Sequence, residues 1–192
     1  MTAKLIFFAG SARKESLNKK LAQAAANTAS DIGAEVTVID LADYELPIYN
    51  GDFEDENGMP QAAIDLKELF ASHDGFLVAS PEYNSSYSAL LKNTIDWMTR
   101  PHMDDEPFLM AFNGKIAALT AASPGGLGGL RGLAPLRVLL SNIGVHVIPT
   151  QMALSGAGKA FDAGGNLSDD KQNSMLTKVV KQLTGTAKKL RS

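Results

Sequence analysis

The chain has 192 residues, of which 45% are hydrophobic and 20% are charged, and its formal net charge is -3. This composition is typical of a soluble globular protein, and the length suits a single domain spanning residues 1–192. The small negative charge disfavours nonspecific binding to nucleic acid or to an anionic membrane, because both favour clustered positive charge. The chain has no cysteine, which excludes disulfides and thiolate chemistry and fits a cytoplasmic location.

Apolar runs and helical patterns alternate along the first third of the chain. Residues 4–9 form a continuous apolar run, as expected for a strand that is buried on both faces. Alanine and leucine at helical spacing predict a helix from Ser16 or Leu17 to about Ser30, and Gly33 is a stop signal. The β-branched segment 35–40 predicts a second strand.

Residues 41–59 are acidic, lack clear periodicity and predict a long loop, which is usually functional or lies at an interface. Pro60 suits the first turn of a helix that runs to about His73. Residues 75–80 predict a third strand, and the next helix runs from about Ser88 to Thr99, just before Pro101.

The second half of the chain continues the alternation. The sequence predicts a loop at 100–114, a strand at 115–121, a glycine-rich turn at 123–129, a helix to about Asn142, a strand at 145–148, a loop at 155–166 and a last helix from Ser168 that ends in Lys188, Lys189 and Arg191. Five strands alternating with helices predict an α/β fold with a doubly wound parallel sheet.

The loop after the first strand has the chemistry of a phosphate site. In doubly wound sheets, ligands bind beyond the carboxyl ends of the strands. A helix that starts near Ser16 offers unpaired backbone N–H groups there. Ser11 and Asn18 add polar donors, and Arg13 can bind phosphate oxygens in a bidentate manner. An ordinary capped helix with polar surface residues is the alternative.

The loop after the third strand suits a flat polar ring. Pro81 stiffens this loop, and the consecutive backbone N–H groups of Glu82, Tyr83 and Asn84 could face one edge of the ring. Such donors would stabilise negative charge on a reduced flavin. A plain turn between strand and helix explains the spacing equally well.

The loop after the fourth strand, Ser123-Pro124-Gly125-Gly126-Leu127-Gly128-Gly129, is rich in glycine, which lets a backbone approach a planar ligand. A flexible turn is the alternative. This loop does not match G-x-G-x-x-G, because Arg131 stands where the last glycine should be. The three histidines are scattered, and no metal-ligand spacing appears, so we expect no metal site.

These motifs together resemble the NADPH-dependent FMN reductases of flavodoxin-like fold, a family that includes quinone, chromate and azo-dye reductases. The match consists of Gly10-Ser11-x-Arg13-x-x-Ser16-x-Asn18, Pro81-Glu82-Tyr83-Asn84-x-Ser86, Leu91-Lys92-Asn93-x-x-Asp96-Trp97 and Ser123-Pro124-Gly125. One departure is that Ser88 and Ala89 stand where the family usually carries Pro-Gly.

The resemblance implies strand order 2-1-3-4-5, an FMN cofactor, NADPH or NADH as electron donor, a small-molecule acceptor such as a quinone, and a homodimer or homotetramer. No side chain is expected to be an indispensable catalytic acid or base, because the flavin carries the redox chemistry. The residues expected at the flavin are Ser11, Arg13, Ser16, Leu17, Asn18, Pro81, Glu82, Tyr83, Asn84, Ser86, Ser123, Pro124, Gly125 and Gly126.

Two other functions are compatible with the same fold. A flavodoxin-type electron carrier would have no substrate turnover of its own, but Arg13 and the modest net charge disfavour it. A binding or regulatory module without flavin would stay colourless after FMN is added.

Overall fold

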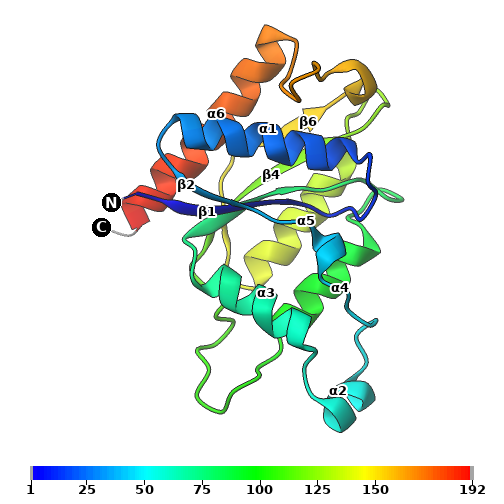
Figure 1. Ribbon diagram of the computed structural model, residues 1–192, viewed down its shortest axis with the longest axis vertical. Coiled ribbons are helices and arrows are strands. Elements are labelled where there is room, and N and C mark those ends of the chain that lie inside the picture. The colour runs from blue at the N-terminus through cyan, green and yellow to red at the C-terminus, as the bar shows by residue number, and fades with distance from the viewer. Residues whose placement is uncertain (1, 191–192) are drawn as a thin grey trace.

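A computed structural model of the protein describes residues 2–190 and shows a parallel sheet with helices on both faces (Figure 1). The strands are β1 Lys4–Ala9, β2 Glu35–Val38, β3 Gly75–Ala79, β4 Ile116–Ala122, β5 His146–Val147 and β6 Met152–Leu154. The helices are α1 Leu17–Asp31, α2 Gly51–Asn57, α3 Gln61–Ala71, α4 Ala89–Met98, α5 Leu130–Asn142 and α6 Asp170–Leu190, with 3₁₀ helices η1 Leu41–Asp43 and η2 Ala157–Lys159.

The sheet order is β2-β1-β3-β4-β5, which confirms the predicted flavodoxin-like topology. All neighbouring strands are parallel, and Ala9 of β1 aligns with Ala79 of β3, which aligns with Thr120 of β4. The carboxyl ends of these three strands therefore lie together at one edge of the sheet. This edge is where doubly wound sheets bind ligands.

Two apolar cores enclose the sheet because β3 and β4 are buried on both faces. α1 and α6 cover one face, where the alanines of α1 pack closely against the strands. α3, α4 and α5 cover the other face, where Phe8, Phe70, Phe76 and Phe112 form a cluster of tilted and edge-to-face rings.

The last part of the sheet differs from the prediction. The fifth strand is short, and a further strand, β6, follows it and also pairs with β4. Pro149 separates the two strands because proline has no N–H to donate to the ladder. The predicted final helix begins at Asp170 and continues to Leu190, and Arg191 lies outside the described residues.

The prediction of one long loop at 41–59 is wrong, because the short helices η1 and α2 lie within it. The side chain of Asn50 caps α2 by accepting from the N–H of Asp52, and Gly58 ends the helix with positive φ. The helix has no buried residue, so no apolar periodicity marks it in the sequence. The segment before α2 is tied to α4, since Trp97 Nε1 donates to the Pro47 carbonyl oxygen at 2.7 Å.

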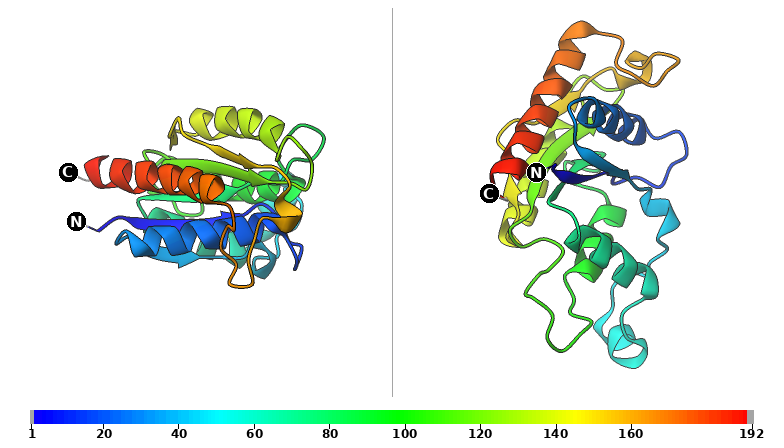
Figure 2. Two further views of the ribbon diagram at one scale, coloured as in Figure 1. Left: turned by 90° about the horizontal axis from the view of Figure 1, so that it is seen from above. Right: turned by 60° about the vertical axis from the view of Figure 1, so that its left-hand side comes forward.

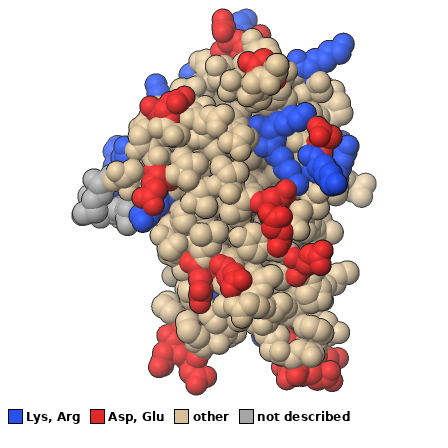
Figure 3. All heavy atoms as spheres, in the orientation of Figure 1, with Lys and Arg blue, Asp and Glu red and all other residues tan. Residues whose placement is uncertain are grey.

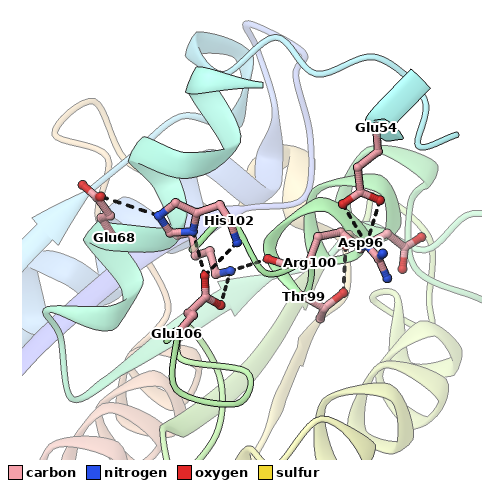
Figure 4. Close-up of polar contacts among 8 residues, drawn as sticks. Glu54, Glu68, Asp96, Thr99, Arg100, His102 and Glu106 are labelled. Carbon is pink, nitrogen blue, oxygen red and sulfur yellow. Dashed lines mark hydrogen bonds and ion pairs between the residues drawn. The ribbon is translucent and has the colours of Figure 1, made fainter. Parts of the chain in front are cut away.

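α2 and the 100–114 segment project beyond α3 and α4 in Figure 1 and in the right-hand view of Figure 2. Figure 4 shows the polar contacts that hold them. Arg100 Nε binds both carboxylate oxygens of Glu54 at 2.9 and 3.0 Å. The ammonium of Lys67, fully buried on α3, pairs with the Glu106 carboxylate and donates to the Arg100 carbonyl oxygen. His102 Nδ1 lies 2.7 Å from Glu106 Oε2.

Candidate functional site

Three loops meet at the carboxyl edge of the sheet: 10–16 after β1, 80–88 after β3 and 123–129 after β4. Hydrogen bonds extend the sheet into the first two loops, from Gly10 N–H to the Ala79 carbonyl and from Ser80 N–H to the Thr120 carbonyl. The Ser88 hydroxyl donates to the Gly10 carbonyl at 2.6 Å and accepts from Leu91 N–H. Ser88, which departs from the family pattern, thus caps α4 and joins two loops.

The first loop presents unpaired donors at the start of α1. Ser16 caps this helix by accepting from the N–H of Lys19, and the backbone N–H groups of Leu17 and Asn18 have no partner among the described residues. The guanidinium of Arg13 is exposed and likewise has no partner within residues 2–190. Unpaired N–H groups at a helix start, beside an arginine, form an anion site.

The side chain of Asn18 has a structural task that its sequence position does not reveal. Its Nδ2 donates to the Ala122 carbonyl at 3.0 Å, and its Oδ1 accepts from the Ala122 N–H at 2.9 Å. Asn18 is buried and joins α1 to the end of β4. Spacing alone cannot show this pairing, because the two residues are far apart in the sequence.

The second loop is a tight hairpin. Tyr83 and Ser86 exchange backbone hydrogen bonds at 2.9 and 3.0 Å, and Asn84 and Ser85 between them have φ of 52° and 64°. Positive φ at both central residues is typical of a type I′ turn. The N–H of Tyr83 is therefore engaged, and among the three N–H groups expected at a ring edge, those of Glu82 and Asn84 have no partner in the described chain.

The third loop lies against β6, which the sequence analysis did not predict. At Gly128, with φ of 62°, an added Cβ would come within 2.7 Å of backbone atoms of Ala153, Leu154 and Ser155. Gly125 and Gly126 are both exposed; an added Cβ would lie 3.6 Å from the Ser123 hydroxyl at Gly125 and would meet nothing within 4 Å at Gly126. A cleft of about 460 Å³ lies between this loop and the second loop. Glycine is thus required for packing at Gly128 and leaves room for a ligand at Gly126.

Arg131 borders the candidate site, although no sequence motif named it. It lines the same cleft, its Nε binds Glu82 Oε1 at 2.8 Å, and its backbone N–H binds Glu82 Oε2 at 3.0 Å. The Glu82 carboxylate therefore faces Arg131. One sequence feature could have indicated Arg131, because this arginine follows the glycine-rich loop within one helical turn.

A second groove, of about 730 Å³, lies on the other side of the first loop. It is lined by Ala12, by residues 41–47 except Asp43, and by Leu90 of α4. Partial burial raises the pKa of Tyr44 in this groove, and the negative charge of Asp43 raises it further. The loop predicted to be functional or at an interface thus borders the candidate site.

Charge is distributed unevenly around these loops. Figure 3 shows basic side chains gathered over the start of α1 and acidic side chains at the tips of the lower projections. Arg13, Lys14, Lys19 and Lys20 belong to the basic segment, and Lys19 is paired with Asp40. This basic character favours an anionic ligand group at the first loop.

All three histidines lie outside the three loops. His73 bonds to Thr37 Oγ1 and the Leu69 carbonyl, beside the amino end of β3, and His146 begins β5. Both lie at the sheet edge opposite the three loops. Residues 2–190 contain no cluster of three or more acidic or histidine side chains that could hold a metal ion. None of their helices combines the length and apolar character needed to cross a membrane.

Comparison with known proteins agrees with this arrangement. A relative from Pseudomonas aeruginosa, an NAD(P)H-dependent FMN reductase, is 34% identical over 98% of this chain and 97% of its own. A 2-hydroxy-1,4-benzoquinone reductase from a Burkholderia species is 31% identical over 92% of both chains. The structure also resembles the flavoenzyme NAD(P)H:acceptor oxidoreductase FerB from Paracoccus denitrificans, with a TM-score of 0.84, 29% identity and 98% coverage of both chains.

The model of the NADPH-dependent FMN reductase family matches residues 3–159, which include all three loops. This match confirms the resemblance that the motifs indicated and favours an oxidoreductase over an electron carrier or a flavin-free module. The chain belongs to the NADPH-dependent FMN reductase family.

Proposed function

We propose that this protein is an FMN-dependent NAD(P)H oxidoreductase that passes electrons from a nicotinamide donor to a small acceptor, with a quinone as the main candidate. The observation that carries the proposal is the meeting of an unpaired anion site and an open glycine-lined cleft at one sheet edge. Family membership and the names of the relatives supply the reaction class.

The residues present fit the phosphate of FMN. The N–H groups of Leu17 and Asn18 and the guanidinium of Arg13 would bind the phosphate oxygens, and the buried hydroxyls of Ser11 and Ser16 have hydrogens left to donate. Charge-assisted donors of this kind hold a phosphate strongly.

The second and third loops fit a planar ring. The N–H groups of Glu82 and Asn84 would donate to its polar edge, while the backbone bonds between Tyr83 and Ser86 hold the hairpin in shape and Pro81 leads into it. Ser123, Pro124, Gly125 and Gly126 would border the ring on the other side of the cleft, where Gly126 has no atom within contact distance of its Cβ position. These assignments are proposals for the predicted residues.

The protein's own part in the mechanism is binding, orientation and charge stabilisation. FMN, when bound, supplies the redox chemistry. The backbone donors of the second loop would stabilise negative charge that develops on the ring edge. No histidine lies in the three loops. Their two carboxylates, those of Glu15 and Glu82, pair with Lys20 and Arg131, so protons can come from water.

An absorbance titration tests the proposal. The purified protein is mixed with FMN, separated from free flavin, and then mixed anaerobically with NADPH or NADH, followed by 1,4-benzoquinone. We expect retained flavin absorbance, bleaching by a nicotinamide donor and recovery with the quinone. A protein that stays colourless after FMN addition would support a flavin-free module. Flavin that is bound but not bleached by either donor would support an electron carrier.

Three finer properties are part of the same proposal. We propose that residues 1–192 form one FMN-binding domain, that the protein is cytoplasmic, and that it forms a homodimer or homotetramer with an interface near the flavin cleft. The absence of cysteine supports a reducing compartment. Ile48, 86% exposed in the segment that borders the site, supports an interface there.

A further inference from the structure

We propose that Arg131 binds an oxyanion group of the substrate that lies against the flavin, so that it selects anionic substrates. This inference rests on the proposed function, because it assumes that the cleft between the second and third loops is the place where a substrate meets FMN. Arg131 lines this cleft from the first turn of α5. Its side chain is 61% exposed, although it is bonded to the largely buried Glu82.

The pairing with Glu82 orients the guanidinium and leaves its outer end unpaired. Glu82 accepts from Nε and from the backbone N–H of Arg131, at 2.8 and 3.0 Å. Neither terminal nitrogen of Arg131 has a partner within the described chain. Two donors on a planar group, held from behind by a carboxylate, suit bidentate binding of a phosphate, carboxylate or sulfonate.

Comparison with the other described arginines shows that this arrangement is specific. Arg137, one turn and a half further along α5, uses its terminal nitrogens on Val147, Ile148 and Gln151. Arg100 binds Glu54 and also lies 5.6 Å from the centre of the Tyr49 ring. Arg13 is unpaired but lies at the helix start that suits the cofactor phosphate. Arg131 is therefore the arginine left for a substrate.

The chemistry of the proposed substrates offers two sources of an oxyanion. A nicotinamide dinucleotide carries a pyrophosphate, and its phosphorylated form carries one phosphate more. An acceptor can instead carry a carboxylate or sulfonate. Both would meet the same unpaired guanidinium at the mouth of the cleft, so the test must separate donor from acceptor.

The test compares the parent with Arg131→Gln, which removes the charge but keeps the backbone N–H that holds Glu82. Arg131→Lys keeps a charge without the bidentate geometry. Lys178→Gln is the matched control, because it removes one positive charge from an exposed position on α6, which covers the opposite face of the sheet. FMN content and thermal midpoint are measured first for every variant, so that loss of fold or cofactor is recognised.

Two readouts are then collected on FMN-loaded protein. Calorimetry gives the dissociation constants of NADP⁺ and NAD⁺ without turnover. Steady-state kinetics gives kcat/KM for NADPH, for NADH and for the phosphate-free donor 1-benzyl-1,4-dihydronicotinamide, and for a sulfonated and an uncharged quinone.

We expect Arg131→Gln to weaken the binding of one class of anionic substrate, or to lower its kcat/KM, by about tenfold or more. This is the size expected for the loss of a charge-assisted contact. Loss for both dinucleotides identifies the pyrophosphate, loss for NADP⁺ and NADPH alone identifies the additional phosphate, and loss for the sulfonated quinone alone identifies the acceptor. Arg131→Lys should recover part of the loss, and Lys178→Gln should change nothing by more than about twofold.

Unchanged constants for every anionic substrate in Arg131→Gln would overturn the inference. So would an equal loss for the phosphate-free donor and the uncharged quinone, which would assign Arg131 to the shape of the cleft. A parent protein that binds FMN but reacts with no nicotinamide donor would refute the proposed function instead, so the two failures are distinguishable.

Discussion

Arginine and glycine residues have opposite effects in the loops at the strand ends, because arginine adds charge and glycine leaves space. Arg13 is exposed without a partner beside the start of α1. Gly128 and Gly126 belong to one loop, yet an added Cβ would clash with backbone at Gly128 and meet nothing within 4 Å at Gly126. Each difference leads to a measurable prediction.

Arg13→Ala is expected to weaken FMN binding by about tenfold to a hundredfold, since a charge-assisted phosphate contact contributes roughly 1.5 to 3 kcal/mol. The affinity for riboflavin, which lacks the phosphate, should fall much less. Fluorescence titration with both flavins measures the two constants. Lys14→Ala removes a neighbouring exposed charge and serves as the control. Equal losses for FMN and riboflavin would show that Arg13 does not bind the phosphate.

Gly128→Ala is expected to lower the free energy of unfolding by roughly 1 to 3 kcal/mol, because the new methyl group clashes with the β6 backbone at positive φ. Gly126→Ala, in the same loop, should change stability by less than about 0.5 kcal/mol. Urea unfolding of both variants gives the comparison. Equal stability of the two would contradict the close approach of the third loop to β6.

At the scale of elements, the 100–114 segment is held to α3 by a buried ion pair. Lys67 and Glu106 are almost fully enclosed. Burial raises the pKa of Glu106, but hydrogen bonds from the Lys67 ammonium and the His102 N–H outweigh burial and hold this pKa below its ordinary value of 4.5. A depressed carboxyl pKa stabilises the fold above the ordinary value, and this stabilisation is lost as pH falls through the folded-state pKa.

Lys67→Met is expected to destabilise the protein by about 3 to 5 kcal/mol at pH 7, because it leaves the Glu106 charge buried without the ammonium. The double variant Lys67→Met with Glu106→Gln should lose less stability than the two single variants lose in sum. The stability difference between the parent and Glu106→Gln should shrink as pH is lowered below 4.5. Thermal unfolding at several pH values provides the measurement, and a difference that grows toward acid would refute the assignment.

At the scale of the whole molecule, exposed apolar side chains border the candidate site on one side. Ile48 is 86% exposed beside the groove formed by residues 41–47 and α4. The segment before Ile48 is fixed to α4, because the side chains of Asn93 and Trp97 both donate to the Pro47 carbonyl. An exposed apolar side chain beside such a fixed segment suits a subunit interface.

Light scattering at micromolar concentration is therefore expected to show a dimer or tetramer. Ile48→Asp should shift the population toward monomer, because it places a charge in the interface. Leu190→Asp, at an exposed apolar position near the end of α6, is the control and should leave the assembly unchanged. A fully active monomeric parent would contradict the oligomer, and an unaffected Ile48→Asp assembly would contradict its placement.

Sequence patterns alone were sufficient to predict the alternation of strands and helices and the three loops of the candidate site, and the family resemblance supplied the order of the sheet. Buried strands leave continuous apolar runs, and caps such as Ser16 and stop signals such as Gly33 mark helix ends locally. The family motifs lie within these loops and in the helices α1 and α4 that follow the first two of them. Local chemistry was sufficient because each signal acts on residues close in the chain.

The contacts between distant residues became visible only in the folded structure. Three contacts join segments that are far apart in the chain: the hydrogen bonds of Asn18 to Ala122, those of Arg131 to Glu82, and the close packing of Gly128 against β6. α2 was missed because it buries no side chain, and β6 because Pro149 divides the last strand. Hydrogen bonding and packing across the fold set these features, and neither composition nor spacing encodes which distant partner a polar side chain will meet.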